Sequence, residues 1–180
     1  MLKDSVVRLD GFIEDILNYS RNTRMDVVNE EINFGEVLEE IRNSQKFAEG
    51  ADKLKPLIEI YQKGKFISDK KRLNVVLNNI VSNAIKYKDT SKEEYFVSIF
   101  VECDIENAII TIEDNGIGIA DDKKEKVFDM FYRATTLSTG SGLGLYIVKE
   151  TLEKLGGTIT LESKLNMGTK FSIQIPNQNN

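Results

Sequence analysis

The hydrophobic pattern of this chain changes its period several times, and this alternation constrains the fold more than any other feature. Apolar residues recur with the spacing of amphipathic helices over 34–48, 69–87 and 142–155. Runs typical of β-strands occupy 57–61, 95–103, 108–113, 158–162 and 170–175, and 65–68 is expected as a short strand beside the first of them. This order predicts an α+β fold, a two-layer sandwich in which helices cover one face of a mixed, mostly antiparallel sheet.

One long amphipathic helix is expected ahead of this domain, over residues 1–20. Its apolar residues follow a heptad spacing at Leu2, Val6, Leu9 and Ile13. Because this spacing begins at the second residue, we expect the helix to be half of a helical hairpin whose partner lies upstream. The alternative is a helix that packs on the chain's own domain.

The composition excludes several classes of function. The 180 residues carry 24 basic and 29 acidic side chains, a net charge of −5, without a basic cluster, which argues against nucleic acid as the main partner. A single cysteine, Cys103, excludes a disulfide framework and a cysteine-based zinc site. The chain has no histidine, and therefore no histidine base, histidine metal ligand or phosphohistidine of its own. No apolar run approaches the roughly 18 residues that a membrane-spanning helix needs.

The helix that is expected to begin after the N-cap Asp69 carries a polar stripe beside its apolar face. Asn79 and Asn83 lie four residues apart, and Lys86 and Tyr87 continue the stripe by one turn. Asparagine is a mediocre helix former, so two stacked asparagines lower the stability of a helix unless they have partners. The stripe is either solvated surface or a set of amide oxygens for a hard cation, with a lysine close by for phosphate.

Two glycine-rich motifs flank a third motif that contains aromatic residues. The first, 114–118 (DNGIG), follows a predicted strand, so a carboxylate at a strand end precedes backbone that a ligand can approach closely. The second, 140–145 (GSGLGL), leads into a helix whose free N–H groups and dipole favour an anion. Its spacing fits neither a dinucleotide fingerprint nor a Walker loop. Between them, 128–133 (FDMFYR) and small polar residues are expected to form a mobile lid over 121–139.

Together these motifs resemble the ATP-binding catalytic domain of sensor histidine kinases, within the group shared with gyrase, Hsp90 and MutL. The boxes of that family are matched in order, the N box by 79–87, the G1 box by 114–118, the F box by 128–133, the G2 box by 140–145, and a small motif that completes the pocket by Gly168-Thr169. Residues 1–24 are similar to the second helix of the family's dimerisation hairpin. The resemblance divides the chain into an incomplete dimerisation and phosphoacceptor hairpin (1–24) and an ATP-binding catalytic domain (25–180).

The resemblance implies one site for ATP and Mg²⁺. Asn83 would coordinate Mg²⁺ with support from Asn79, and Lys86 would neutralise phosphate charge. Asp114 would accept a hydrogen bond from the adenine amino group, with Thr169 helping through water. The other residues would approach adenine, lie against the nucleotide, donate amides to the triphosphate or shape the lid: Tyr87, Gly116, Gly118, Ile119, Phe131, Arg133, Gly140, Ser141, Gly142, Leu143 and Gly144. No catalytic residue is assigned, because the phosphoacceptor histidine is absent.

The resemblance also implies an activity and its partners. A protein-histidine kinase would transfer the γ-phosphoryl group of ATP to a histidine on a hairpin helix that this chain lacks, for relay to the receiver domain of a response regulator. The full-length kinase would be a homodimer with a cytoplasmic catalytic domain, in a parent protein that upstream segments could anchor to a membrane.

Asn79 stands where hydrolysing relatives carry a glutamate that activates water, and an amide is not a general base. We therefore expect negligible ATP hydrolysis, and no autophosphorylation by this fragment alone. The alternatives are a serine/threonine kinase of the anti-sigma type and a nucleotide-gated interaction module without transfer activity.

Overall fold

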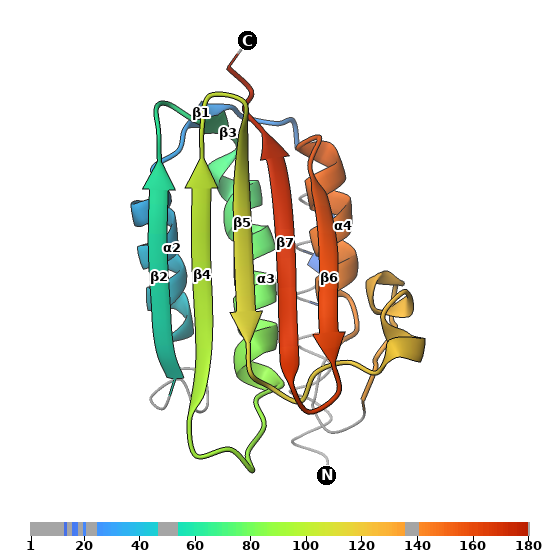
Figure 1. Cartoon of the computed structure of the whole chain (residues 1–180). Helices are drawn as coiled ribbons and strands as arrows, with labels where there is room; N and C mark the ends of the chain where they lie inside the picture. Colours follow the sequence, from blue (N-terminus) through green and yellow to red (C-terminus); the bar gives the residue numbers. More distant parts are fainter. Residues whose placement is uncertain are drawn as a thin grey trace.

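The computed structural model of the chain describes residues 25–46, 54–135 and 141–179, together with Ile13, Ile16, Leu17 and Ser20. In this part of the chain, a five-stranded sheet lies against a layer of helices (Figure 1). The strands follow one another across the sheet in the order β2 (Leu54–Gln62), β4 (Tyr95–Cys103), β5 (Asn107–Asp114), β7 (Gly168–Pro176) and β6 (Thr158–Lys164). The other elements are α2 (Phe34–Gln45), α3 (Lys70–Lys86), α4 (Gly144–Lys154), the short strands β1 (Glu30–Glu31) and β3 (Ile67–Ser68), and the 3₁₀ turns η2 (Asp121–Lys123) and η3 (Lys126–Phe128).

The strand pairing confirms a mixed, mostly antiparallel sheet. β2 runs parallel to β4, whereas the other three pairs of the sheet are antiparallel. Parallel neighbours need a crossover connection, and α3 supplies it on the helical side. The expectation that 65–68 would lie beside β2 was wrong, because β3 pairs with β1 instead. Gly64, with a φ of +96°, turns the chain after β2, and β3 then forms a separate two-stranded ribbon.

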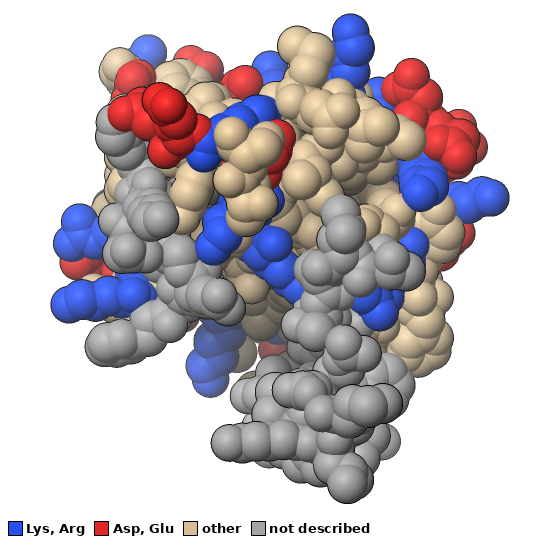
Figure 2. Space-filling view, turned by 90° about the horizontal axis from the view of Figure 1, so that it is seen from below, with Lys and Arg blue, Asp and Glu red and all other residues tan. Residues whose placement is uncertain are grey.

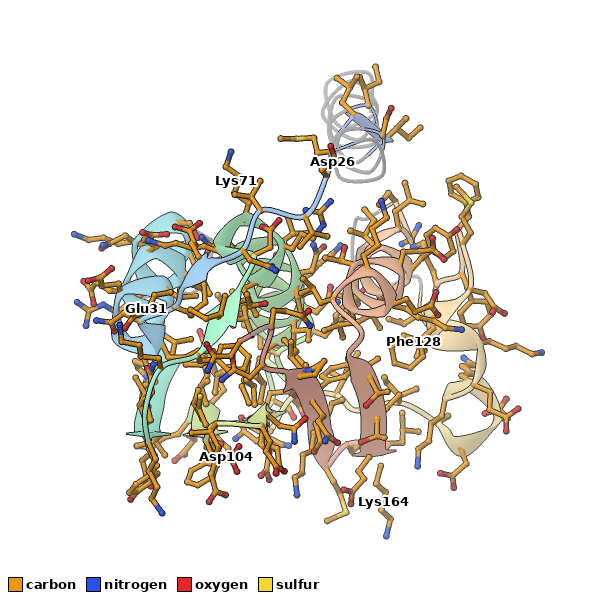
Figure 3. All side chains as sticks on the ribbon, turned by 90° about the horizontal axis from the view of Figure 1, so that it is seen from above. Asp26, Glu31, Lys71, Asp104, Phe128 and Lys164 are labelled. Atoms are coloured by element: carbon orange, nitrogen blue, oxygen red, sulfur yellow. The ribbon has the colours of Figure 1, made fainter. Side chains whose placement is uncertain are left out.

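The three helices cover one face of the sheet because each has one apolar stripe. α3 begins after Asp69, whose side chain accepts a hydrogen bond from the N–H of Arg72, as predicted for the N-cap. The side chain of Asn33 caps α2 in the same way. Seen from above (Figure 3), the helices form one layer and the sheet the other, with Lys71 on the helical side and Asp104 on the side of the sheet. The buried side chains of α3 are Arg72, Leu73, Val76, Leu77, Ile80, Val81, Ala84 and Ile85.

The core lies between the two layers because the strand side chains alternate in direction. In β4, Val97, Ile99 and Val101 are buried, whereas Phe100 and Glu102 are exposed on the opposite face. Each buried aliphatic side chain contributes about 1.5–3 kcal/mol relative to an exposed one. This packing holds the C-terminal ends of α3 and β5 in a fixed relation, and the candidate site lies between them.

The predicted helix over residues 1–20 lies largely outside the described residues. The four described positions in that segment are helical, and the side chains of Ile13, Ile16 and Leu17 are exposed by 47, 39 and 50%. Residues 47–48, the predicted end of α2, also lie outside the described ranges. Within the described part of the chain, no helix has both the length and the apolar character of a membrane span.

Candidate functional site

A pocket of about 210 Å³ opens where the end of β5, the C-terminal half of α3 and the start of α4 meet. Figure 2 shows the molecule from this end, with Lys and Arg side chains across the middle of the face and Asp and Glu mainly toward its upper corners. Such a distribution favours an anionic ligand. The pocket is lined by Asn79, Ser82, Asn83, Ala84, Lys86, Tyr87, Asp114, Ile117, Gly118, Ile119, Val127, Tyr132, Arg133, Ala134, Thr135, Ser141, Gly142, Gly144, Leu145, Thr169 and Phe171.

Asp114, the last residue of β5, supplies a partly buried carboxylate to this pocket. Burial raises the pKa of Asp114 to about 6, and hydrogen bonds from the backbone N–H groups of Gly116 and Thr169 oppose this shift. The N–H of Gly116 lies 2.8 Å from Oδ1 of Asp114. At neutral pH the group is therefore mainly ionised, and it is a strong acceptor for an N–H of a ligand.

The backbone after β5 packs closely against two other segments. Gly118 has a φ of +65°, and a Cβ there would lie 2.0 Å from the carbonyl oxygen of Lys164. A Cβ on Gly116 would lie 2.5 Å from the carbonyl oxygen of Tyr87, which also accepts a hydrogen bond from the N–H of Ile117 at 3.0 Å. Only glycine fits at these two positions, so the DNGIG motif joins the end of α3 to the β6–β7 turn.

The hydroxyl of Ser163 on β6 connects this loop to Thr169. Ser163 Oγ accepts a hydrogen bond from the N–H of Ile119 at 2.8 Å and lies 3.0 Å from Thr169 Oγ1. It also donates to the carbonyl oxygen of Gly168 at 2.8 Å. Ser163 thus positions two predicted site residues, a role that its place in a strand does not reveal in the sequence.

The polar stripe of α3 faces the start of α4. Asn79 Nδ2 donates to the carbonyl oxygen of Val75 at 2.8 Å, and Asn79 Oδ1 would lie 3.0 Å from a Cβ on Gly144. Asn83 Nδ2 would lie 3.9 Å from the same Cβ, and Lys86 lines the pocket one turn further on. The stripe therefore lines the pocket and is not simply solvated surface, whereas the binding of a hard cation by its amide oxygens stays a prediction.

The start of α4 offers backbone N–H groups to the pocket. Gly142 has a φ of +75°, and a Cβ there would lie 2.7 Å from the carbonyl carbon of Phe131, so this turn packs against the F-box segment. The N–H of Leu143 donates to Ser141 Oγ at 3.2 Å. α4 begins at Gly144 without a side-chain cap, and its first N–H groups have no acceptor within the helix. An anion is favoured at such a terminus.

The F-box segment contributes to the pocket through residues other than its phenylalanines. Phe128 packs against the core and is labelled in Figure 3. Phe131, with a φ of +65°, is 50% exposed and does not line the pocket, whereas Tyr132 does. Lys123 Nζ donates to the carbonyl oxygen of Ala134 at 2.8 Å. Residues 136–139 of the predicted lid lie outside the described ranges, so its mobility stays a prediction.

Most residues that the sequence assigned to the site lie together in this pocket. Gly116 supports Asp114 from beside the pocket, Leu143 is fully buried and outside the lining, and Gly140 lies outside the described residues. The lining residues that the sequence did not assign are Ser82, Ala84, Ile117, Val127, Tyr132, Ala134, Thr135, Leu145 and Phe171. Several of these lie within the four motifs, but no local signal marks Phe171, which faces the pocket through the register of β7.

The polar side chains of the pocket suit a metal ion that is held mainly by the phosphate groups of a bound molecule. In the described part of the chain, no group of three or more His, Cys, Asp or Glu side chains could hold a metal ion. Mg²⁺ is commonly bound by one or two protein oxygens together with substrate phosphates. Asn83 and Asn79 place amide groups on one wall of the pocket, which fits Mg²⁺ in that form.

Comparison with known proteins agrees with this geometry. Residues 68–179 match the family described as "Histidine kinase-, DNA gyrase B-, and HSP90-like ATPase". The chain is 33% identical to the methanogenesis regulatory histidine kinase FilI of Methanothrix harundinacea (strain 6Ac), over 98% of this chain and 20% of that protein. It is 32% identical to the sensor protein SrrB of Staphylococcus aureus (strain MRSA252), over 96% of this chain and 30% of that protein. The chain thus spans less than a third of the length of these relatives.

Solved structures show the same fold. The Acinetobacter baumannii histidine kinase AdeS superposes with a TM-score of 0.77 at 27% identity, over 99% of this chain and 83% of that one. Full-length ShkA, solved in complex with AMPPNP, shares the fold with a TM-score of 0.80 at 22% identity, over 98% of this chain and 37% of that one. The chain therefore belongs to the histidine kinase-, DNA gyrase B- and HSP90-like ATPase family, and it contains a histidine-kinase ATP-binding catalytic domain. The relatives do not favour the anti-sigma kinase or the interaction module.

Proposed function

We propose that this domain binds ATP together with Mg²⁺ in the described pocket and that, in its parent protein, it transfers the γ-phosphoryl group to a histidine on a hairpin helix. The observation that carries the proposal is one pocket lined by a carboxylate from β5, an asparagine stripe from α3 and the glycine-rich start of α4. These groups suit the base, the metal and the phosphates of a nucleotide, respectively.

Asp114 is the group that recognises adenine. Its ionised carboxylate accepts from the exocyclic amino group, which guanine does not present at that position. Thr169, 8% exposed and tied to Ser163, completes this end of the pocket through a water. Ile117 and Phe171 supply apolar surface for the base.

The phosphate end uses charge and backbone donors. Lys86 and Arg133 line the pocket as cations, and the N-terminus of α4 donates N–H groups. Asn83, with Asn79 behind it, would hold Mg²⁺, which would neutralise the charge of the transferring phosphoryl group. In phosphoryl transfer, positioning and charge stabilisation supply most of the rate enhancement, and these residues provide both.

The described lining of the pocket does not offer a base that would activate water. Asp114 is the only carboxylate among the lining residues that the structure describes, and the proposal assigns it to adenine. Asn79 cannot accept a proton at neutral pH. The acceptor's own surroundings would therefore supply the acid–base chemistry, which suits transfer to a partner hairpin and disfavours hydrolysis.

The partners of the parent kinase follow from the same proposal. The acceptor histidine would lie on a dimerisation hairpin, the parent protein would be a homodimer with this domain in the cytoplasm, and a response regulator receiver domain would take the phosphoryl group. The similarity to FilI, a regulatory histidine kinase, and to SrrB, a sensor protein, supports this context.

Calorimetric titration with Mg²⁺–ATP tests the site. Asp114→Asn should weaken binding by about 1–3 kcal/mol, because it removes the charged acceptor from a partly buried contact. Glu102→Gln is the matched control, since this carboxylate is exposed on β4 and does not line the pocket, so its loss should change binding by less than about 0.5 kcal/mol. Asn83→Ala should remove most of the Mg²⁺ dependence. Unchanged binding in both site variants would overturn the assignment.

The transfer step needs the acceptor in a separate chain. Incubation of this domain with labelled ATP and the histidine-containing hairpin of its parent kinase should label the hairpin, and a histidine-to-alanine hairpin should stay unlabelled. Label on a serine or threonine would favour the anti-sigma type of kinase. ATP binding without any labelled product would leave only the interaction module.

A further inference from the structure

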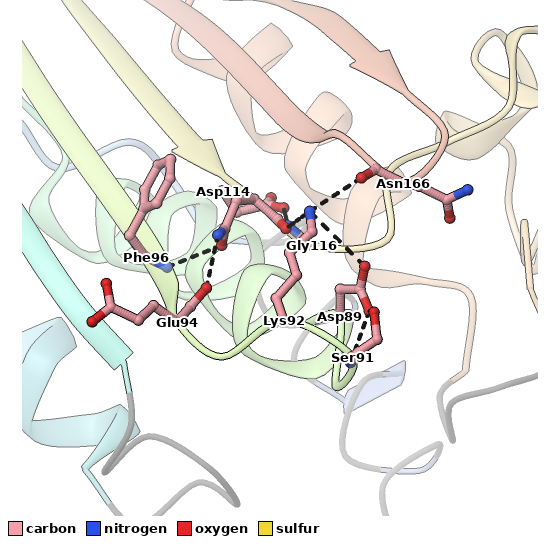
Figure 4. A network of polar contacts seen from close by, with 9 residues as sticks. Asp89, Ser91, Lys92, Glu94, Phe96, Asp114, Gly116 and Asn166 are labelled. Atoms are coloured by element: carbon pink, nitrogen blue, oxygen red, sulfur yellow. Dashed lines mark hydrogen bonds and ion pairs between the residues drawn. The ribbon is translucent and has the colours of Figure 1, made fainter.

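A single lysine outside the predicted motifs joins three loops beside the adenine end of the pocket. Lys92 Nζ donates to the carbonyl oxygen of Asn115 at 2.6 Å and to that of Asn166 at 3.1 Å, and it lies 3.9 Å from Asp89 Oδ2 (Figure 4). These partners belong to the loop after β5, the β6–β7 turn and the loop after α3. The ammonium group of Lys92 thus makes two hydrogen bonds to backbone carbonyl oxygens, and the Asp89 carboxylate lies at ion-pair distance.

Asn115 is held on its side-chain end as well. Asn115 Nδ2 donates to the carbonyl oxygen of Glu94 at 3.0 Å, and Asn115 Oδ1 accepts from the N–H of Phe96 at 3.0 Å. The side chain of Lys92 is 29% exposed, so water screens its contacts only in part. The carbonyl group of Asn115 therefore has little freedom to rotate.

The carbonyl of Asn115 and the N–H of Gly116 belong to one planar peptide group. Lys92 fixes the oxygen of this group, and the N–H of the same group donates to Asp114 Oδ1 at 2.8 Å. A cation on the carbonyl oxygen also polarises the peptide, which strengthens its N–H as a donor. We propose that Lys92 is a positioning residue for base recognition, because it fixes the peptide plane that orients the Asp114 carboxylate toward adenine.

This inference rests on the proposed role of Asp114 and adds a residue that acts through it. The charges that act on Asp114 agree with the geometry. Burial raises its pKa, Glu113 raises it further, and the positive charge of Lys92 lowers it. Across the pocket, Lys86 and Arg133 are the other charged lining residues. Loss of the lysine would both release the peptide plane and favour the protonated carboxyl, which is a weaker acceptor for the amino group of adenine than the carboxylate.

The test is a Lys92→Met variant of the full 180-residue chain, titrated with Mg²⁺–ATP between pH 5.5 and 8. ATP affinity should fall about tenfold at pH 7.5, the loss expected when one charge-assisted hydrogen bond is misaligned. The acid limb of the affinity profile should also move to higher pH. Lys92→Arg should restore both quantities. Lys65→Met is the control, because Lys65 is 73% exposed and pairs only with the exposed Glu31 among the described ion pairs.

Magnesium tripolyphosphate serves as a probe without a base. Its affinity should be equal in wild type and in Lys92→Met, because the lysine acts at the adenine end. An equal loss of tripolyphosphate and ATP affinity would show that Lys92 binds phosphate and would overturn the proposal. Wild-type ATP affinity and an unmoved acid limb in Lys92→Met would overturn it too, while leaving the proposed function intact.

Two outcomes separate this proposal from the proposed function and from a role in folding. A wild-type chain that does not bind ATP at any pH contradicts the proposed function itself. If Lys92→Met does not fold, Lys92→Gln replaces it, with a shorter neutral side chain and the same expected results. If neither variant folds while Lys65→Met does, Lys92 maintains the fold and the positioning role is rejected.

Discussion

Replacement of Gly118 by alanine should disrupt the pocket more than any other single methyl group on this loop. Gly118 has a φ of +65°, where an L-residue with a Cβ loses about 1–2 kcal/mol. The new Cβ would also lie 2.0 Å from the carbonyl oxygen of Lys164 and 2.8 Å from its carbonyl carbon. Both atoms are backbone, so a rotamer change cannot relieve the contact.

The size of the effect follows from what must move. The Lys164 carbonyl has to retreat by about 1 Å to reach the shortest distance that real Cβ atoms show. That carbonyl accepts from the N–H of Met167 at 3.0 Å, and the N–H of Asn166 donates to the carbonyl oxygen of Ile117 at 2.7 Å. Each bond contributes about 0.5–1.5 kcal/mol. With the conformational strain, the free energy of unfolding should fall by about 2–5 kcal/mol.

Gly156→Ala is a matched control for this variant. Gly156 has a similar φ of +69°, but among the described residues a Cβ there would meet only the Cγ of Pro176, at 3.4 Å. It should cost about 1–2 kcal/mol from the backbone conformation alone and leave ATP affinity unchanged. In Gly118→Ala, the displaced β6–β7 turn should also shift Thr169, and ATP affinity should fall at least about tenfold.

Urea denaturation and calorimetric ATP titration of the two variants measure these quantities. Equal losses of stability in Gly118→Ala and Gly156→Ala, with wild-type ATP affinity in both, would refute the close packing of this loop on the β6–β7 turn. A loss of affinity in Gly156→Ala as well would show that the pocket responds to distant strain and not to this contact.

Four further predictions concern charge and chemistry. Because burial raises the pKa of Asp114 to about 6 from 3.8, ATP affinity should fall about tenfold between pH 7 and pH 5, measured by calorimetry against Asp114→Asn, which should lack this step. The stability of the nucleotide-free domain should depend on pH in the opposite direction, because the raised pKa of Asp114 means that protonation favours the folded state. This stabilisation is complete below about pH 4 and is lost as the pH rises through about 6, which thermal melts at several pH values will show. Arg72→Met should lower the free energy of unfolding in urea by about 3–5 kcal/mol, because Arg72 forms a buried ion pair with Asp69 and also donates to the carbonyl oxygens of Met25 and Asp26. Arg42→Met is its control and should cost less than about 1 kcal/mol, because Arg42 forms an exposed ion pair with Glu39. Phosphate release by the wild-type chain should stay far below about 1 per second, a typical enzyme turnover, and a higher rate would contradict the role given to Asn79.

The elements of this fold were predictable because their signals are local. The N-cap Asp69, the bounds of β4 and the hairpin between β4 and β5 each depend on residues within a few positions of one another. Helical periodicity likewise identified α3 and its polar stripe. The error at β3 arose because its partner, β1, lies more than thirty residues earlier in the chain, and no local pattern specifies such a pairing.

The sequence by itself determined which residue types are available for chemistry. Because this chain has no histidine, it cannot supply a histidine acceptor, whatever its fold. Because residue 79 is an asparagine, it cannot supply a water-activating glutamate at that position. The order of the glycine motifs also specified which backbone segments a ligand can approach. These conclusions depend only on covalent structure and on conformational preferences that each residue carries with it.

Only the tertiary structure decided which of these residues act together. Lys92 and Ser163 show no motif in the sequence, yet the register of β5, β7 and β6 brings Asn115, Asn166 and Thr169 within hydrogen-bond distance of them. The raised pKa of Asp114 likewise comes from burial, which only the folded chain produces. The two hydrogen bonds of Lys92 join residues separated by 23 and 74 positions, and packing of the complete core is what brings them together.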